Sequence, residues 1–367
     1  MKIRECLLTM IIAVAASVPA SLQEVGGEEE TGPYDVVPQW LKPLPTHNAE
    51  WGWGNAAGVF AQSPDRIFVL TRGDLPKPPV RTPRTLMLTP QQVLASNDTR
   101  KQNFVVVVNR NGEMVDNWTQ WDSMIRVPHR IKINPYDPEK HVWIMDHGRQ
   151  QVMKFTNDGK KMVMAIGVAE QAGNDHDHLG GVVDIDWLPD GTILVADGGE
   201  PVTVTSRVVK YTADGKYISE WGGNGEAPGQ FRGTHGIAVD AQRRVYVADR
   251  GNRRMQVFDE NGKLLKIWPN LRQMDYILAA PDGFLWGVDG MTNKVLKYDL
   301  EGHLKYAWGT QGSFDGGMSS PHGMSVDQEG NLYIADFFNQ RVQKFQPRKG
   351  ADKSRLIPRP IAWPAKK

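Results

Sequence analysis

Short apolar runs alternate with turn residues along most of the chain. One unit begins at residues 235–240 (His-Gly-Ile-Ala-Val-Asp) and continues at 245–249 (Val-Tyr-Val-Ala-Asp). Two more runs follow at 254–258 and 264–268, and turn pairs such as Gly-Asn and Asn-Gly stand between them. Alternating, β-branched and aromatic runs of this kind are typical of half-buried antiparallel strands. The pattern therefore predicts a meander of four strands in about forty residues.

The same unit recurs along the chain. A second clear copy covers residues 322–345, and its second strand again ends in aspartate. Comparable second strands are found at 67–71, 142–146, 193–197, 245–249, 285–289 and 332–336. A repeat of this size with four strands in each copy predicts a β-propeller. Six copies predict an all-β fold with six blades.

The repeat also resembles a known one. A strand that ends in aspartate, followed by a run such as Arg-Val-Gln-Lys-Phe at 341–345, is similar to the NHL repeat. The resemblance covers residues 57–346 and implies a six-bladed propeller of NHL repeats. It implies no particular activity, because repeat folds host many functions.

Composition and the N-terminal segment narrow the class of protein. The chain has 367 residues, of which 40% are hydrophobic and 23% charged, and its net charge is +1. This is an ordinary globular composition, and it gives no strong field that would attract nucleic acid. Residues 1–20 have the basic start, apolar run and small-residue end of a secretory signal. The apolar run is too short for a stable membrane span, although an uncleaved anchor is the alternative.

The remaining segments follow from this division. Residues 21–33 are expected to form a polar linker, 34–346 the propeller, and 347–367 a basic, Pro-rich tail. Because a propeller must close its ring, we expect residues 34–39 to complete the blade that contains 322–345. We expect a secreted or periplasmic monomer that does not associate with a membrane once the signal has been removed.

Three histidines occupy one place in alternate copies of the repeat. Counting back five residues from the end of each first strand gives, in blade order, Ala57, His129, Gly181, His235, Asp275 and His322. First strands line the central channel of a propeller, so these positions should form a ring. The histidines fall in blades 2, 4 and 6 and should therefore converge on one point at one mouth of the channel.

Three converging imidazoles are typical of a metal centre. A catalytic zinc site uses three protein ligands and keeps a fourth position open, with Zn–N of about 2.0–2.1 Å. Any one of these histidines taken alone reads more readily as a structural residue, and it is the shared register that favours a metal. Zinc is the default, but iron, manganese or copper can also be bound by three nitrogens.

A second ring follows the residue that ends each second strand. Its members, in blade order, are Arg72, His147, Gly198, Arg250, Gly290 and Phe337. They should lie at the same mouth, because the second strand is antiparallel to the first. An arginine fork matches a carboxylate, so Arg72 and Arg250 predict an anionic substrate. Alternatively, Arg250 pairs with Asp249 or with an aspartate of a neighbouring blade. His147 is a candidate general acid or base, or a spectator.

The residues around both rings resemble the lyase domain of the peptidylglycine α-amidating enzymes. The shared stretches are Val127-Pro128-His129, Thr234-His235-Gly236, Ser320-Pro321-His322-Gly323, Thr71-Arg72-Gly73-Asp74 and Val247-Ala248-Asp249-Arg250. The resemblance implies zinc bound by His129, His235 and His322, and two active-site arginines at Arg72 and Arg250. It implies a carbon–nitrogen lyase that cleaves a peptidyl-α-hydroxyglycine, a carbinolamide with a carboxylate, into a peptide amide and glyoxylate.

Two positions depart from that family's pattern. The family's catalytic tyrosine follows an Asp-Gly pair after the second strand of blade 3, where this chain has Gly199. His147, Glu200 on an inserted stretch, or a hydroxide held at the metal could remove the proton instead. The family's structural calcium uses an aspartate directly after the third histidine, where this chain has Gly323. A calcium site is therefore in doubt.

Two other functions stay open. Without the tyrosine, the enzyme could act on another small substrate with an α-hydroxyl or a carboxylate. The alternative from a different class is a non-catalytic NHL propeller that binds a protein or a glycan on one face.

Overall fold

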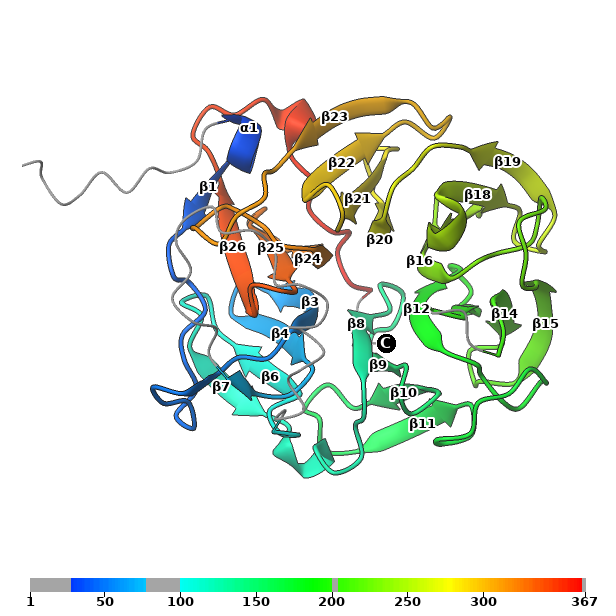
Figure 1. Ribbon diagram of the computed structural model, residues 1–367, viewed down its shortest axis with the longest axis horizontal. Helices are drawn as coiled ribbons and strands as arrows, with labels where there is room; N and C mark the ends of the chain where they lie inside the picture. The colour runs from blue at the N-terminus through cyan, green and yellow to red at the C-terminus, as the bar shows by residue number, and fades with distance from the viewer. Residues whose placement is uncertain (1–27, 77–99, 200–203, 365–367) are drawn as a thin grey trace, which may run out of the picture.

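The computed structural model describes residues 28–76, 100–199 and 204–364 (Figure 1). Within these ranges, six four-stranded antiparallel sheets are arranged around a central axis as the blades of a propeller. The predicted all-β, six-bladed fold is confirmed. The predicted signal at 1–20 and Glu200 lie outside the described residues, as do most of the linker at 21–33 and the end of the tail.

The first three blades follow one another along the chain. Blade 1 consists of β3 (Ala56–Ser63), β4 (Arg66–Thr71), β6 (Val105–Val108) and β7 (Met114–Asn117). Blade 2 consists of β8 (Pro128–Ile133), β9 (Val142–Asp146), β10 (Gln151–Phe155) and β11 (Met162–Ile166). Blade 3 consists of β12 (Val182–Trp187), β13 (Ile193–Asp197), β14 (Arg207–Tyr211) and β15 (Tyr217–Gly222).

The other three blades complete the ring. Blade 4 consists of β16 (Thr234–Val239), β17 (Val245–Asp249), β18 (Arg254–Phe258) and β19 (Leu264–Trp268). Blade 5 consists of β20 (Met274–Ala279), β21 (Leu285–Asp289), β22 (Lys294–Tyr298) and β23 (Leu304–Trp308). Blade 6 consists of β24 (Pro321–Val326), β25 (Leu332–Asp336), β26 (Arg341–Pro347) and β1 (Tyr34–Val37).

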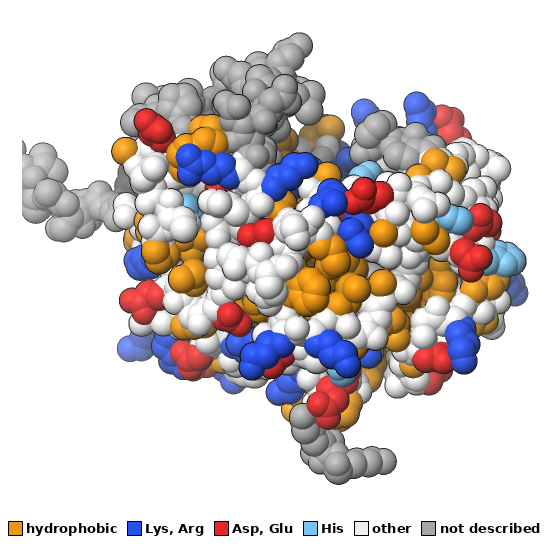
Figure 2. Space-filling view, turned by 90° about the horizontal axis from the view of Figure 1, so that it is seen from below, with side chains coloured by type: hydrophobic (Ala, Val, Ile, Leu, Met, Phe, Trp, Pro, Cys, Tyr) orange, Lys and Arg blue, Asp and Glu red, His pale blue; other side chains and the backbone are white. Residues whose placement is uncertain are grey.

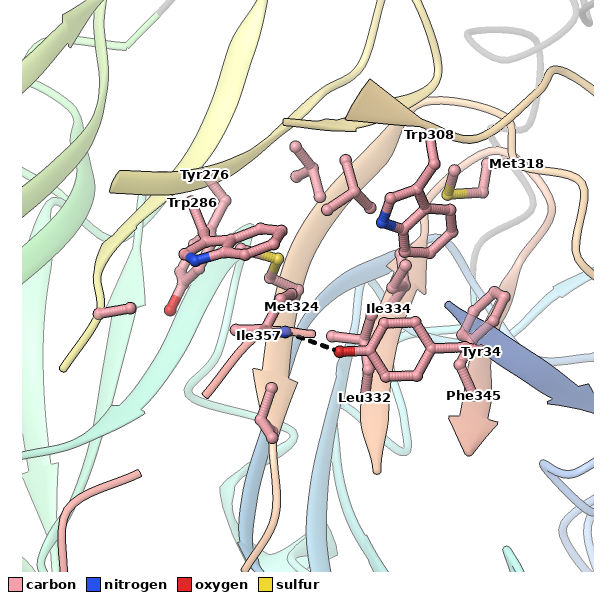
Figure 3. Close-up of a cluster of buried hydrophobic side chains, with 14 of the residues drawn as sticks. Tyr34, Tyr276, Trp286, Trp308, Met318, Met324, Leu332, Ile334, Phe345 and Ile357 are labelled. Atoms are coloured by element: carbon pink, nitrogen blue, oxygen red, sulfur yellow. Dashed lines mark hydrogen bonds between the residues drawn. The ribbon is translucent and has the colours of Figure 1, made fainter. Parts of the chain in front are cut away.

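The N-terminal strand closes the ring. β1 pairs antiparallel with β26, with Tyr34 opposite Pro347 and Val37 opposite Lys344, so residues 34–39 do supply the missing strand. Tyr34 is fully buried in an apolar cluster between blades 5 and 6 that includes Trp308 (Figure 3). Its hydroxyl accepts a hydrogen bond from the backbone N–H of Ile357 at 2.9 Å. Burial of large aromatic side chains therefore joins the two ends of the chain.

The segment predicted as a tail packs against the propeller. It contains a 3₁₀ turn, η3 (Lys353–Arg355), and then Ile357, which is buried. Near the end of the described chain, Trp363 packs on Phe60 of β3, with ring centroids 6.4 Å apart. In Figure 1 this part of the chain runs inward to the middle of the ring. Because Phe60 lies toward the end of β3, the tail crosses the mouth opposite to the start of the first strands.

The aspartate at the end of a second strand holds the loop that leads into the first strand of its own blade. In blade 2, Asp146 Oδ1 accepts hydrogen bonds from the backbone N–H of Val127 at 2.9 Å and of Gly148 at 3.0 Å. In blade 4, Asp249 accepts from the N–H of Arg232 at 2.8 Å. A buried carboxylate requires such partners. The repeated aspartate therefore fixes the backbone on both sides of the predicted rings.

Each first strand has a β-bulge near its start. The bulges include, in blade order, Ala57, His129, Val183, His235, Asp275 and His322. A bulge bends the strand and changes the direction of a side chain. The expectation of Gly181 in blade 3 was wrong: Asp186 looks like the aspartate after a first strand, but it lies inside β12, which runs two residues further than the register assumed.

One side of the molecule carries both signs of charge. On the side of the molecule seen in Figure 2, basic and acidic side chains are interspersed, and hydrophobic side chains lie exposed between them. This agrees with the small net charge. Along the three described ranges, no helix is long and apolar enough to cross a membrane.

Candidate metal centre and anion site

The structure brings the three predicted histidines together at one mouth of the channel. His129, His235 and His322 are 5%, 3% and 6% exposed. Their candidate ligand nitrogens all lie within 4.8 Å of one another. Ring centroids are 4.7 Å apart for His129 with each of the other two, and 5.1 Å apart for the remaining pair.

Each histidine is oriented by the blade that follows it. Nδ1 lies 2.7 Å from the carbonyl oxygen of Val183 for His129, 2.8 Å from that of Asp275 for His235, and 2.8 Å from that of Ala57 for His322. A carbonyl oxygen only accepts, so each Nδ1 carries the proton and each Nε2 keeps its lone pair. Metal-binding histidines are commonly fixed in this way by a partner on the other ring nitrogen.

The imidazoles are also held neutral. Burial lowers the pKa of all three well below the ordinary value, and neighbouring positive groups lower it further. Metal binding requires the neutral ring. The three buried histidines could therefore hold a metal ion, and the donor set of three nitrogens fits a transition metal rather than a hard cation that prefers oxygen.

Arg72 lies in the same mouth without a directly contacting carboxylate among the described residues. Its Nε is buried without a hydrogen bond, and among the described residues its guanidinium has no ion-pair partner. The guanidinium carbon lies 5.0 Å from the ring centroid of Phe337, which in turn packs 5.2 Å from the ring of His322. Burial lowers the pKa of Arg72 to about 10; the negative charge of Asp146 opposes this shift, and the positive charge of Arg250 adds to it.

Arg250 is paired within the protein. Its Nη1 donates to Oδ1 of Asp275 in blade 5 at 2.7 Å, so the ion pair with an aspartate of a neighbouring blade is present. Asp275 is fully buried, which raises the pKa of its carboxyl to about 6 although Arg250 opposes the shift. A Cβ at Gly290 would lie 2.0 Å from Asp275 Oδ2, so glycine at this ring position leaves room for the carboxylate.

His147 stands beside the histidine cluster. Its ring centroid lies 6.5 Å from that of His129, and its Nδ1 is buried without a hydrogen bond. Burial and the nearby charge of Arg72 lower its pKa, so the ring is neutral at neutral pH. A Cβ at Gly199 would lie 2.7 Å from Val183 Cγ1 and 3.0 Å from His147 Cε1. A side chain at position 199 would therefore require Val183 to move and His147 to shift by a few tenths of an ångström.

Sequence reasoning missed Arg130, which directly follows the first histidine. It is 1% exposed and lies in the channel. A Cβ at Gly323 would approach Arg130 Nη1 to 3.0 Å. Glycine offers no side-chain oxygen, and a guanidinium already stands next to it. The residues present here do not fit a calcium ion. The contact between Arg130 of blade 2 and Gly323 of blade 6 joins two blades, so no local sequence pattern predicts it.

Comparisons with known proteins agree with the fold. Residues 231–258 and 318–345 match the NHL repeat. A solved streptogramin B lyase structure has a TM-score of 0.55 and 13% identity, covering 86% of this chain and 98% of that one. At this identity the likeness shows the fold alone.

Three curated relatives resemble the chain more closely in sequence. Peptidyl-glycine alpha-amidating monooxygenase A of Xenopus laevis is 29% identical over 247 residues, which cover 62% of this chain and only 25% of that protein. NHL repeat-containing protein 3 of Mus musculus is 28% identical, covering 62% and 69% of the two chains. The probable peptidyl-alpha-hydroxyglycine alpha-amidating lyase of Caenorhabditis elegans is 24% identical, covering 65% and 68%.

Proposed function

We propose that this protein is a metal-dependent carbon–nitrogen lyase. Its substrate would be a peptidyl-α-hydroxyglycine, or another small α-hydroxy compound with a carboxylate. The observation that carries the proposal is the cluster of three neutral, buried histidines beside Arg72, a partly buried cation without an ion-pair partner among the described residues. The likeness to proteins named amidating lyases supports the same reaction class.

The metal would be held by Nε2 of His129, His235 and His322, since each Nδ1 is engaged with a carbonyl oxygen. We propose zinc, and iron, manganese and copper are the other candidates for three nitrogens. When bound, zinc supplies a Lewis acid that lowers the pKa of a substrate hydroxyl.

Arg72 would bind the carboxylate of the substrate. An arginine fork forms two parallel hydrogen bonds with a carboxylate. The carboxylate would also supply the negative partner that the guanidinium of Arg72 lacks among the described residues. Stacking on Phe337 restricts where the guanidinium can lie. Arg250, held by Asp275, adds positive charge at the same mouth, which would favour negative charge that develops on the substrate.

His147 would act as the base. A ring nitrogen accepts the proton of the carbinol hydroxyl, the electron pair of that O–H bond forms the aldehyde C=O of glyoxylate, and the C–N bond breaks. The amide nitrogen keeps the bonding pair and takes a proton, which His147 can return. The ring stands where Gly199 leaves space, so it would replace the family's tyrosine. Glu200 is the second candidate for this role.

Two measurements on the purified protein test the proposal together. Metal analysis should find one transition-metal ion per chain, and an α-hydroxyglycine peptide should be converted to the peptide amide and glyoxylate. A protein that holds the metal but cleaves no carbinolamide would refute the lyase reaction while leaving the metal centre intact.

A second candidate is a non-catalytic binding module. It is favoured by the likeness to NHL repeat-containing protein 3, which extends over 69% of that protein. A binding module has no need of stoichiometric metal, so metal analysis also separates the two candidates.

We also propose that the chain is exported and acts as a monomer outside the cytoplasm. Support comes from the basic start and apolar run of residues 1–20. N-terminal sequencing of the mature protein should find a start near residue 21, and sedimentation should give one chain per particle.

A further inference from the structure

Arg130 spans the channel from blade 2 to blades 5 and 6. Its Nη1 donates to the carbonyl oxygen of His322, and its Nη2 donates to the carbonyl oxygen of Asp275 at 2.7 Å. The guanidinium carbon also lies 5.0 Å from the ring centroid of Tyr276. A single side chain therefore joins three blades at the level of the bulges.

These two carbonyl groups belong to the histidine cluster. One is the backbone of His322 itself. The other, of Asp275, accepts at the same time from Nδ1 of His235 at 2.8 Å. Arg130 is also the chain neighbour of His129 in β8. The guanidinium thus fixes the backbone at one predicted ligand, the orienting partner of a second, and the strand of the third.

The carboxylate nearest to the charge of Arg130 lies beyond hydrogen-bonding distance. Arg130 Nε lies 3.8 Å from Asp184 Oδ1, and that oxygen is closer to Lys132 Nζ, at 2.7 Å. A buried cation is costly unless it is paired and hydrogen-bonded, and a shorter polar or apolar side chain would avoid the cost. The carboxylate of Asp184 therefore pairs mainly with Lys132 and not with Arg130. The contacts that distinguish Arg130 are those with the two carbonyl oxygens.

We propose that Arg130 is a positioning residue for the metal centre, a built-in cation that holds His235 and His322 in register across the channel. Its guanidinium lies beside Gly323 and holds together two carbonyl oxygens that come from blades 5 and 6. With this cation in place, we expect one transition-metal ion per chain and no requirement for calcium. This inference rests on the metal centre of the proposed function, but not on its reaction.

Three variants test the role. Arg130→Met removes the charge and both hydrogen bonds at similar length, and Arg130→Lys keeps the charge but loses the fork. Lys132→Met is the matched control, because it removes a buried cation from the same strand without touching either carbonyl group. The Zn²⁺ affinity of each variant is measured by competition with a chelator. The visible absorption spectrum is recorded after each variant has been loaded with Co²⁺. Unfolding of the metal-free proteins is followed in urea.

We expect Arg130→Met to bind Zn²⁺ about 10–100-fold more weakly, the usual effect of losing a group that orients metal ligands. The Co²⁺ spectrum should change, and Arg130→Lys should recover part of the affinity. Lys132→Met should lower stability of the metal-free protein while the folded form keeps parental affinity and spectrum. Calcium chelation should not change the metal content or stability of the parent.

The outcomes separate this inference from the proposed reaction. Parental Zn²⁺ affinity and an unchanged Co²⁺ spectrum in Arg130→Met would overturn the positioning role, as would a parent protein that binds no transition metal. If Arg130→Met does not fold, the test rests on Arg130→Lys. A Zn²⁺ affinity and a Co²⁺ spectrum equal to those of the parent would then overturn the positioning role of Arg130. A parent that binds metal and depends on Arg130 but cleaves no carbinolamide would refute the lyase activity alone.

Discussion

Arg72 offers a test in which a stabilising substitution removes function. The pKa of Arg72 falls from 12.5 to about 10, and because one pKa unit corresponds to about 1.4 kcal/mol, its charged form costs the folded state about 3 kcal/mol. At pH 7 the arginine is charged in both states, so the whole cost is present there. The contact with Phe337 returns about 1 kcal/mol. We therefore expect Arg72→Met, which keeps the apolar stem, to raise the free energy of unfolding by about 1–2 kcal/mol.

The assay compares this variant with the same substitution at a paired arginine. Arg254 Nε donates to the buried Asp249 at 2.7 Å, so Arg254→Met leaves a carboxylate unpaired and should cost about 3–5 kcal/mol. Urea unfolding at pH 7 gives both values. Calorimetry should show glyoxylate binding to Arg72→Met about 10–100-fold more weakly, since a hydrogen-bonded ion pair is lost. If Arg72→Met loses as much stability as Arg254→Met, the claim that Arg72 has no ion-pair partner is refuted.

Three further predictions concern the metal, the base and the buried channel. His322→Ala should leave a folded protein with less than about a tenth of the parental metal, measured by atomic emission, because two nitrogens bind a metal far more weakly than three. His147→Ala should lower turnover by about 10²–10⁴ with metal content unchanged; parental turnover would reassign the base to Glu200 or to a hydroxide held at the metal. Burial raises the pKa of Asp186 from 3.8 to about 6. Ionisation of this carboxyl is therefore less favourable in the folded state, and the protein should lose stability as the pH rises from 4 to 7. Asp186→Asn should not show this loss, and its free energy of unfolding relative to the parent should improve by about 2–3 kcal/mol across that range; a constant difference would show that the carboxyl titrates normally.

The fold was predictable because its signals are local. Alternation of apolar and polar residues, turn pairs and the aspartate that ends the second strand in blades 2 to 6 all act within one repeat. These signals identified six blades and the closing strand within residues 34–39. Register was less secure. Blade 3 was misaligned by two residues, since Asp186 imitates the strand-ending position while lying inside β12.

The histidine cluster was predictable for a different reason. His129, His235 and His322 are far apart in sequence, and only the repeat register places them on one ring. The partners that orient them could not be predicted in the same way. Their hydrogen bonds go to backbone carbonyl groups of the next blade, which have no sequence signature. For Arg250, pairing with an aspartate of a neighbouring blade was one of two alternatives, and the sequence did not identify Asp275 as that aspartate.

Arg130 shows how alternation itself can mislead. In the strand Pro128–Ile133 the residues Arg130 and Lys132 alternate with two isoleucines, a pattern typical of a strand with one face in water. Both cations are buried instead, because the second face of a first strand lines the channel. Lys132 pairs there with Asp184 of the neighbouring blade at 2.7 Å, and Arg130 donates to backbone carbonyl groups of blades 5 and 6. A polar residue on a first strand should therefore be assigned a partner on another blade before it is assigned to solvent. For Arg130 that partner is the backbone of Asp275 and His322, next to the histidine cluster.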